Sequence, residues 1–153
     1  MVLSQVFNPE SIVVNLESSD KDSVFEELVH ALVKTHPELD ESKILKIIRE
    51  REAKMSTGIM PGIAFPHGKS DDVKGVIGAI GISKNGIDYD SFDDKPVNLV
   101  FLIISSTSDC EYHLSVLTCL SALLKKNGFV EEMLAQNTSE DVYSVLCRNE
   151  KEL

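Results

Sequence analysis

The sequence predicts a single α/β domain, with helices packed on one central, mixed β-sheet. Two long segments are almost entirely apolar, GVIGAIGIS at 75–83 and VNLVFLIIS at 97–105, which is typical of strands covered on both faces. Segments with apolar residues at helical spacing precede and follow them, as in α/β proteins. The 153 residues contain no internal repeat or long linker, so we expect one domain over residues 1–153.

The first third of the chain is expected to form one strand and two helices. SIVVNL at 11–16 indicates a strand. The segment 20–36 has apolar residues at helical spacing, namely Phe25, Leu28, Val29 and Leu32. Pro37 ends that helix, and a second one is expected from about Asp40 to Lys54, with one apolar face formed by Ile44, Ile47 and Ile48.

Beyond the second helix, IAF at 63–65 is expected to be extended, and a short strand around Ile87 separates the two apolar strands. Ser108, with Glu111 three residues later, fits a capping box at the start of another helix. The core face of that helix is expected to be Leu114, Leu117, Ser121 and Leu124. Gly128 ends it, and two further helices are expected at 129–136 and 139–148.

Charge and composition exclude several classes of partner. The formal net charge of −10 argues against nucleic acid. The segment 43–74 nevertheless holds seven basic and four acidic residues, which fits either a site for an anion or a solvated, lysine-rich helix face. No apolar stretch approaches the roughly 18 residues needed to cross a bilayer, and the first residues lack the pattern of a signal peptide. We therefore expect a cytoplasmic protein without direct membrane insertion.

Cofactor and metal motifs are not found in the sequence. The three cysteines form no CxxC pair, which disfavours a zinc site or a disulfide framework. Neither a phosphate-binding GxxxxGK[ST] loop nor an HExxH motif occurs. The sequence thus predicts no metal site and no cofactor.

The segment STGIMPGIAFPHGKS at 56–70 places His67 between Pro66 and Gly68. Proline stiffens the backbone and glycine permits a sharp turn, so we expect the imidazole on a stiff loop at the end of a strand. A histidine with a pKa of about 6.5 is largely neutral at cytoplasmic pH and has one ring nitrogen free to attack. A surface or structural histidine is the alternative, and the surrounding residues favour a functional one.

Two further residues could act with this histidine. Arg51 continues the apolar face of the second helix, and a charge there needs an anion, either an internal carboxylate or a bound phosphoryl group. His113 falls about one turn into the helix that follows Ser108, near backbone N–H groups that could surround a phosphoryl oxygen. A histidine at the edge of the core is the equally plausible alternative for His113.

The string REREAKMSTGIMPGIAFPHGKS at 49–70, followed by HLSVLTCLSALL at 113–124, resembles the enzyme IIA domain of the fructose–mannitol class of the bacterial sugar phosphotransferase system. That class includes nitrogen-regulatory relatives, and the resemblance covers essentially the whole chain. It implies the mannitol-type enzyme IIA fold, a single mixed sheet of about five strands with helices on both faces.

The resemblance also implies roles for individual residues. His67 would accept a phosphoryl group from the phosphocarrier protein HPr or its nitrogen-branch counterpart, with His113 and Arg51 completing the catalytic site. From the residues themselves, hydroxyl and backbone donors of Ser56, Thr57 and Gly68 are expected to bind the phosphoryl group. An apolar rim for partner docking is expected from Ile59, Met60, Ile63 and Phe65.

Three functions remain open from the sequence. In the sugar branch of the family, the phosphoryl group passes to a cysteine of an enzyme IIB for uptake of a sugar. In the nitrogen-regulatory branch, the phosphorylation state itself regulates target proteins. The third alternative is an interaction module that is not phosphorylated. The sequence departs from the family at Met60-Pro61, where a small or polar pair is usual, and at Phe65, where a smaller aliphatic residue is common. We expect these departures to affect the choice of partner rather than the chemistry.

Overall fold

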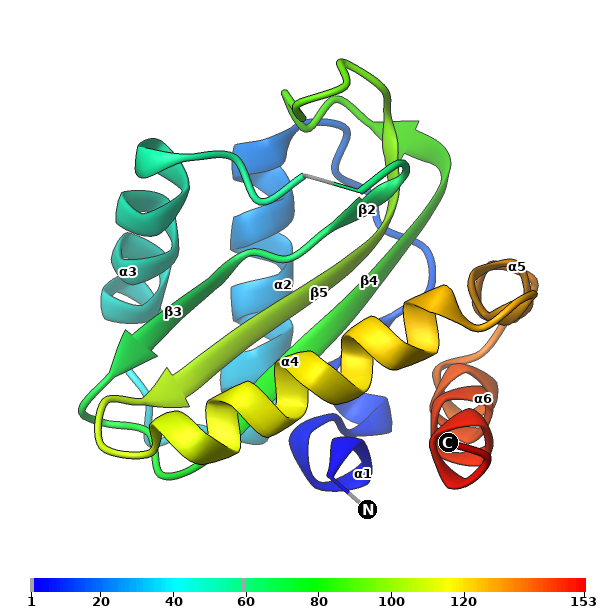
Figure 1. Ribbon diagram of the computed structural model, residues 1–153. Helices are drawn as coiled ribbons and strands as arrows, with labels where there is room; N and C mark the ends of the chain where they lie inside the picture. Colours follow the sequence, from blue (N-terminus) through cyan, green and yellow to red (C-terminus); the bar gives the residue numbers. More distant parts are fainter. Residues whose placement is uncertain (1, 59) are drawn as a thin grey trace.

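The computed structural model describes residues 2–58 and 60–153 and has a mixed sheet at its centre (Figure 1). Within these residues the sheet has five strands: β1 (Ile12–Val13), β2 (Ile63–Ala64), β3 (His67–Ser70), β4 (Val76–Ile87) and β5 (Val97–Ser106). The two long strands, β4 and β5, pair antiparallel, β1 runs parallel to β4, and β2 and β3 run parallel to β5. The expected α/β class with one mixed sheet is confirmed.

Helices cover both faces of this sheet. They are α1 (Leu3–Val6), α2 (Lys21–Thr35), α3 (Glu41–Lys54), α4 (Cys110–Lys125), α5 (Phe129–Leu134) and α6 (Ser139–Lys151), with a 3-10 turn at Pro9–Ser11. In Figure 1, α2 and α3 lie on one face, and the other helices lie on the opposite face. No helix of the described residues is long and apolar enough to span a membrane.

The apolar run in β5 is continuous because the strand contributes to two cores. Leu99, Phe101 and Ile103 pack in the core under α4, α5 and α6. Val100, Leu102 and Ile104 point to the opposite side and pack against α2 and α3. Successive side chains of a strand alternate between faces, so every position from 99 to 104 is buried.

The strands β2 and β3 are consecutive parts of one edge of the sheet. Ile63 and Ala64 pair with the beginning of β5, and His67 to Ser70 pair with its end. Between them, the carbonyl of Pro66 accepts the N–H of Ile103 at 3.0 Å, and proline, which has no N–H to donate, is tolerated at an edge. The expectation of a loop at His67 is wrong because β5 is long enough to pair again beyond Ala64.

Two other strand boundaries differ from the sequence-based expectation. The strand expected at 11–16 is limited to Ile12–Val13, although the N–H of Leu16 still donates to the carbonyl of Ile82 at 3.0 Å. The short strand expected around Ile87 is the end of β4, which pairs with Val97 after an irregularity in the register.

The start of α4 and its buried face also differ. Asp109, rather than Ser108, caps the helix by accepting the N–H of Tyr112 at 3.1 Å. The Ser108 hydroxyl instead contacts that of Ser106 at 2.9 Å. The buried face of α4 consists of Val116, Leu120, Leu123 and Leu124, whereas Leu114 is 60% exposed. The predicted core face of α4 is therefore largely wrong. The prediction took Leu114, the first leucine of the helix, as a core residue and assigned the rest of the face by helical spacing from it.

The helix α1 was not anticipated because four residues are too few to show a periodicity. A buried glutamate of α6 holds its start in place. The Glu150 carboxylate accepts the N–H groups of Val2 and Leu3, the latter at 2.9 Å, which satisfies donors that have no partner within the helix.

Candidate active site

Three elements meet at the β3 edge of the sheet and enclose a cleft of about 730 Å³. They are the end of α3, the start of β3 and the first turn of α4. The cleft is lined by Ile47, Glu50, Arg51, Ala53, Lys54, His67, Gly68, Lys69 and His113. The structure thus brings together Arg51, His67 and His113, which are far apart in the sequence.

The pairing of β3 with β5 determines which layer each residue of β3 faces. His67 lies beside Ile103, whose side chain points toward α4, and Gly68 lies beside Ile104, whose side chain points toward α3. The backbone at Gly68 approaches α3 so closely that a Cβ there would lie 2.3 Å from Cγ2 of Ile47. A glycine at this position therefore lets α3 lie directly against β3, next to His67.

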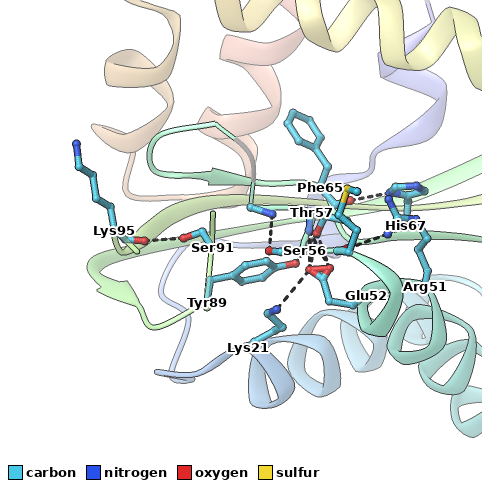
Figure 2. Close-up of polar contacts among 12 residues, drawn as sticks. Lys21, Arg51, Glu52, Ser56, Thr57, Phe65, His67, Tyr89, Ser91 and Lys95 are labelled. Carbon is cyan, nitrogen blue, oxygen red and sulfur yellow. Dashed lines mark hydrogen bonds and ion pairs between the residues drawn. The ribbon is translucent and has the colours of Figure 1, made fainter. Parts of the chain in front are cut away.

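His67 is half-buried, and one of its ring nitrogens is held by the backbone. Nδ1 lies 2.8 Å from the carbonyl oxygen of Phe65 (Figure 2). Because a carbonyl can only accept, Nδ1 carries the proton in this bond, and the neutral ring has its lone pair on Nε2. The side chain is thus oriented with the lone pair of Nε2 free of this bond.

His113 lies across from His67, with the two ring centroids 6.3 Å apart and the rings tilted by 41°. Its Nδ1 is 2.5 Å from the hydroxyl oxygen of Ser105, a buried residue near the end of β5. Burial lowers the pKa of His113 below its ordinary value, and the electrostatic interactions with His67 and Lys69 lower it further. His113 is therefore neutral near pH 7, and its Nε2 is left for another partner.

Arg51 is half-buried in the last turn of α3, and Figure 2 shows it beside His67. Its Nη1 donates to the carbonyl of Met55 at 2.9 Å, which steadies the guanidinium at the end of the helix. The salt bridges found among the described residues do not include Arg51. Of the two anions considered from the sequence, an internal carboxylate thus finds no support.

Two lysines of the cleft were not singled out in the sequence. Lys54 lies one turn after Arg51 on α3, and Lys69 follows His67 by two positions on β3. Residues two apart on a strand share a face, so the HGK sequence would have indicated Lys69 if this segment had been recognised as a strand. Arg51, Lys54 and Lys69 are cationic residues that line the cleft. Glu50 is the one acidic residue among the described residues that line it.

Ser56 and Thr57, expected to bind the phosphoryl group, do not line this cleft. Thr57 is only 4% exposed, and its N–H and hydroxyl both donate to the Glu52 carboxylate, each at 2.8–3.0 Å. The hydroxyl of Ser56 accepts the N–H of Gly58 at 3.1 Å. Thr57 is thus bonded to Glu52 of α3 and Ser56 to the following loop, and of the three expected residues Gly68 alone lines the cleft.

The expected apolar rim is largely inside the protein. Ile63 is only 4% exposed and belongs to the core, so its expected role in docking is wrong. Phe65 is half-buried and stacks on Phe101 with ring centroids 5.6 Å apart. Met60 is half-buried against the same core, and Ile59 lies outside the described residues. The exposed apolar side chains nearest the site in sequence are Met55 and Leu114, which follow Arg51 and His113.

The sequence matches a known protein family over almost its whole length. Residues 5–149 match the model of the phosphoenolpyruvate-dependent sugar phosphotransferase system, EIIA 2. The chain is 32% identical over 151 residues to the fructose-specific EIIABC component of Bacillus subtilis, and this covers 99% of the chain but only about a quarter (24%) of that relative. It is also 32% identical to the fructose-specific EIIA component of Haloferax volcanii, covering 95% of the chain and 94% of that protein.

Solved structures show the same fold. The crystal structure of the nitrogen regulatory protein IIA-Ntr from Neisseria meningitidis matches with a TM-score of 0.87 and 26% identity, over 95% of this chain and 99% of that one. Proteins similar to this chain are thus named both as a fructose-specific EIIA component and as a nitrogen regulatory protein. The match to the family model and the shared fold agree, and this chain belongs to the EIIA 2 family of the phosphoenolpyruvate-dependent sugar phosphotransferase system.

Proposed function

We propose that residues 1–153 act as one phosphoryl-carrier domain, in which His67 Nε2 holds the phosphoryl group. The observation that carries this proposal is the bond between His67 Nδ1 and the Phe65 carbonyl at 2.8 Å, in a cleft that also contains Arg51 and His113. The bond leaves the lone pair of the neutral ring on Nε2. The donor would be phosphorylated HPr or its nitrogen-branch counterpart.

The transfer is a displacement at phosphorus between two imidazoles. The lone pair of His67 Nε2 forms the new N–P bond, and the N–P bond of the donor histidine breaks, so its electron pair returns to the donor ring. The attacking ring becomes positively charged in this step. Its Nδ1–H bond to the Phe65 carbonyl becomes charge-assisted and is strengthened.

Arg51 and His113 would act on the oxygens of the transferring group. The guanidinium offers a planar set of N–H donors suited to phosphoryl oxygens. His113 holds Nδ1 against Ser105, so its Nε2 can meet the same group as a donor when Nδ1 accepts from the serine hydroxyl. Donors placed before the reaction stabilise charge in the transition state without reorganisation.

The next acceptor separates the two branches of the family. We propose transfer from His67 to a cysteine of an enzyme IIB, as in the fructose and mannitol systems. This is favoured by the fructose-specific relatives, each 32% identical to the chain. The alternative is regulation of a target protein by the phosphorylation state, which the similarity to the nitrogen regulatory protein favours.

The proposal is tested by incubating the protein with enzyme I, HPr and phosphoenolpyruvate. We expect one acid-labile, base-stable phosphoryl group per chain in the wild type and none in His67→Ala. His30→Ala is the matched control, because His30 is exposed on α2 and its removal should leave labelling intact. Absence of labelling from HPr and from its nitrogen-branch counterpart would favour the unphosphorylated interaction module.

The roles of the two site histidines are separated by His113→Ala. We expect this variant to accept the phosphoryl group more slowly but still measurably, and to be impaired in transfer to an enzyme IIB. Labelling of His67→Ala together with loss of labelling in His113→Ala would show that the two roles are reversed.

A further inference from the structure

A buried carboxylate lies behind the candidate active site, at the end of α3. Glu52 directly follows Arg51 but points into the protein and is only 7% exposed. It accepts the N–H of Thr57 at 2.8 Å and its hydroxyl at 2.9 Å. Lys21 of α2 lies 3.7 Å away. This carboxylate therefore fixes the loop that follows α3, as Figure 2 shows.

A buried tyrosine completes the contacts of this carboxylate. The hydroxyl of Tyr89 lies 2.8 Å from that of Thr57, and burial together with the charge of Glu52 raises the pKa of Tyr89. Tyr89 is therefore protonated and donates to Thr57, which in turn donates to Glu52. The ammonium of Lys21 also lies 5.0 Å from the centre of the Tyr89 ring, so Lys21 contacts both Glu52 and Tyr89.

The loop is connected to His67 through a single residue. The carbonyl of Thr57 accepts the N–H of Phe65 at 3.2 Å, and the carbonyl of Phe65 accepts Nδ1–H of His67 at 2.8 Å. The Phe65 ring is fixed on its other side by stacking on Phe101. The position of the oxygen that selects the tautomer of His67 thus depends on the Thr57 backbone, which Glu52 holds.

We propose that Glu52 is a positioning residue that, through Thr57 and the backbone of Phe65, keeps His67 in the tautomer with Nδ1 protonated and Nε2 available. This inference rests on the proposed function, in which Nε2 is the attacking atom. In the other tautomer Nε2 carries the proton, so it has no free lone pair and cannot attack the phosphoryl group. The carboxylate itself touches neither His67 nor the cleft.

The tautomer can be measured directly in the unphosphorylated protein. Nitrogen-15 NMR of the imidazole distinguishes a protonated from an unprotonated ring nitrogen at a pH where His67 is neutral. In the wild type we expect Nδ1 protonated and Nε2 unprotonated. In Glu52→Ala and in Glu52→Asp, which remove the carboxylate or withdraw it from Thr57, we expect a mixture of both tautomers, whereas Thr57→Ser keeps every contact with Glu52 and should retain one tautomer.

The chain offers a matched control on the other side of the sheet. Glu150 is also a buried carboxylate, 8% exposed, and also accepts backbone N–H groups, but it belongs to α6. Glu150→Ala should lower stability without changing the tautomer of His67. If Glu52→Ala does not fold, Glu52→Asp decides, because its shorter side chain withdraws the carboxylate from the Thr57 N–H. One unchanged tautomer in a folded Glu52→Ala or Glu52→Asp protein overturns the proposal.

The rate of phosphoryl acceptance provides the second measurement. Only the tautomer with a free Nε2 can attack, so the rate should fall in proportion to its population. An equal mixture in Glu52→Ala would lower the rate about two-fold, while Glu150→Ala keeps the wild-type rate. A mixture of tautomers without any loss of rate would overturn the proposal. If the wild type accepts no phosphoryl group, the proposed function fails, and the NMR comparison still tests the link from Glu52 to His67.

Discussion

The close approach of α3 to β3 is expected to make Gly68→Ala destabilising. The new Cβ would lie 2.3 Å from Cγ2 of Ile47, which is more than about 1 Å inside the usual contact distance of carbon atoms. Ile47 cannot turn away easily, because a β-branched side chain in a helix has one strongly preferred rotamer. Overpacking of this kind costs about 1–3 kcal/mol.

A second effect of opposite sign has to be subtracted from this cost. Gly68 has no positive φ, so alanine adopts its backbone conformation freely and gains about 0.4–1 kcal/mol by restricting the unfolded chain. The two ranges leave a net loss of between about 0 and 2.6 kcal/mol in the free energy of unfolding. Because a 2.3 Å approach is a severe overlap, we expect the upper part of this range, about 1–2.6 kcal/mol. Phosphoryl acceptance should also become slower, because α3 carries Arg51 and would be displaced from His67.

The assay is urea unfolding of four proteins: the wild type, Gly68→Ala, Ile47→Ala and the double variant. Ile47→Ala removes the methyl group that the new Cβ would meet, so in that background Gly68→Ala should become stabilising by about 0.4–1 kcal/mol. This change of sign is the signature of the close contact. A neutral or stabilising effect of Gly68→Ala in the wild-type background would refute the reasoning, as would the same cost in both backgrounds.

Three further predictions concern the charges of the site and the cysteines. Because the pKa of His113 is lowered in the native protein, the unfolded chain takes up a proton at higher pH than the folded one. The urea midpoint of unfolding should therefore fall as the pH drops below about 6.5. The fall should be smaller in His113→Gln, and an equal fall in both proteins would contradict the prediction. Burial and the nearby Glu150 carboxylate raise the pKa of Cys119 to about 12. Iodoacetamide at about pH 8 should therefore alkylate the exposed Cys110 well before Cys119 in the native protein. Equal rates of alkylation would contradict this. Arg51→Lys keeps the charge but loses the planar fork, and phosphoryl acceptance should fall by about 10–100-fold without loss of stability; an unchanged rate would exclude a direct role of the guanidinium.

Much of the fold could be predicted because its strongest patterns are long. The two apolar strands and the helices α2 and α3 are long enough for their periodicity to be clear, and both strands are buried on both faces. The short elements were missed or misplaced. β3 was expected to be a loop, because nothing in HGKS itself indicates a strand, and it pairs only because β5 extends beyond Ala64.

The candidate site was predicted in part. His67 was identified through its neighbours Pro66 and Gly68. Arg51 and His113 were considered from their own positions in the sequence with a structural alternative for each, and the resemblance to a family implied that they complete the site of His67. The position of Thr57 was not predictable, because its hydroxyl is used by Glu52 and Tyr89, and Tyr89 lies 32 residues further along the chain. Ile63 was placed on the surface because a two-residue strand gives no alternation from which to assign its face.

The central claim is that His67 carries the phosphoryl group on the nitrogen that the Phe65 carbonyl leaves free. It is tested most directly by nitrogen-15 and phosphorus-31 NMR of the protein after phosphorylation by HPr. The account predicts one phosphorus coupled to Nε2 of His67, with Nδ1 still protonated. Phosphorus on Nδ1 of His67, or on any other residue, would contradict it.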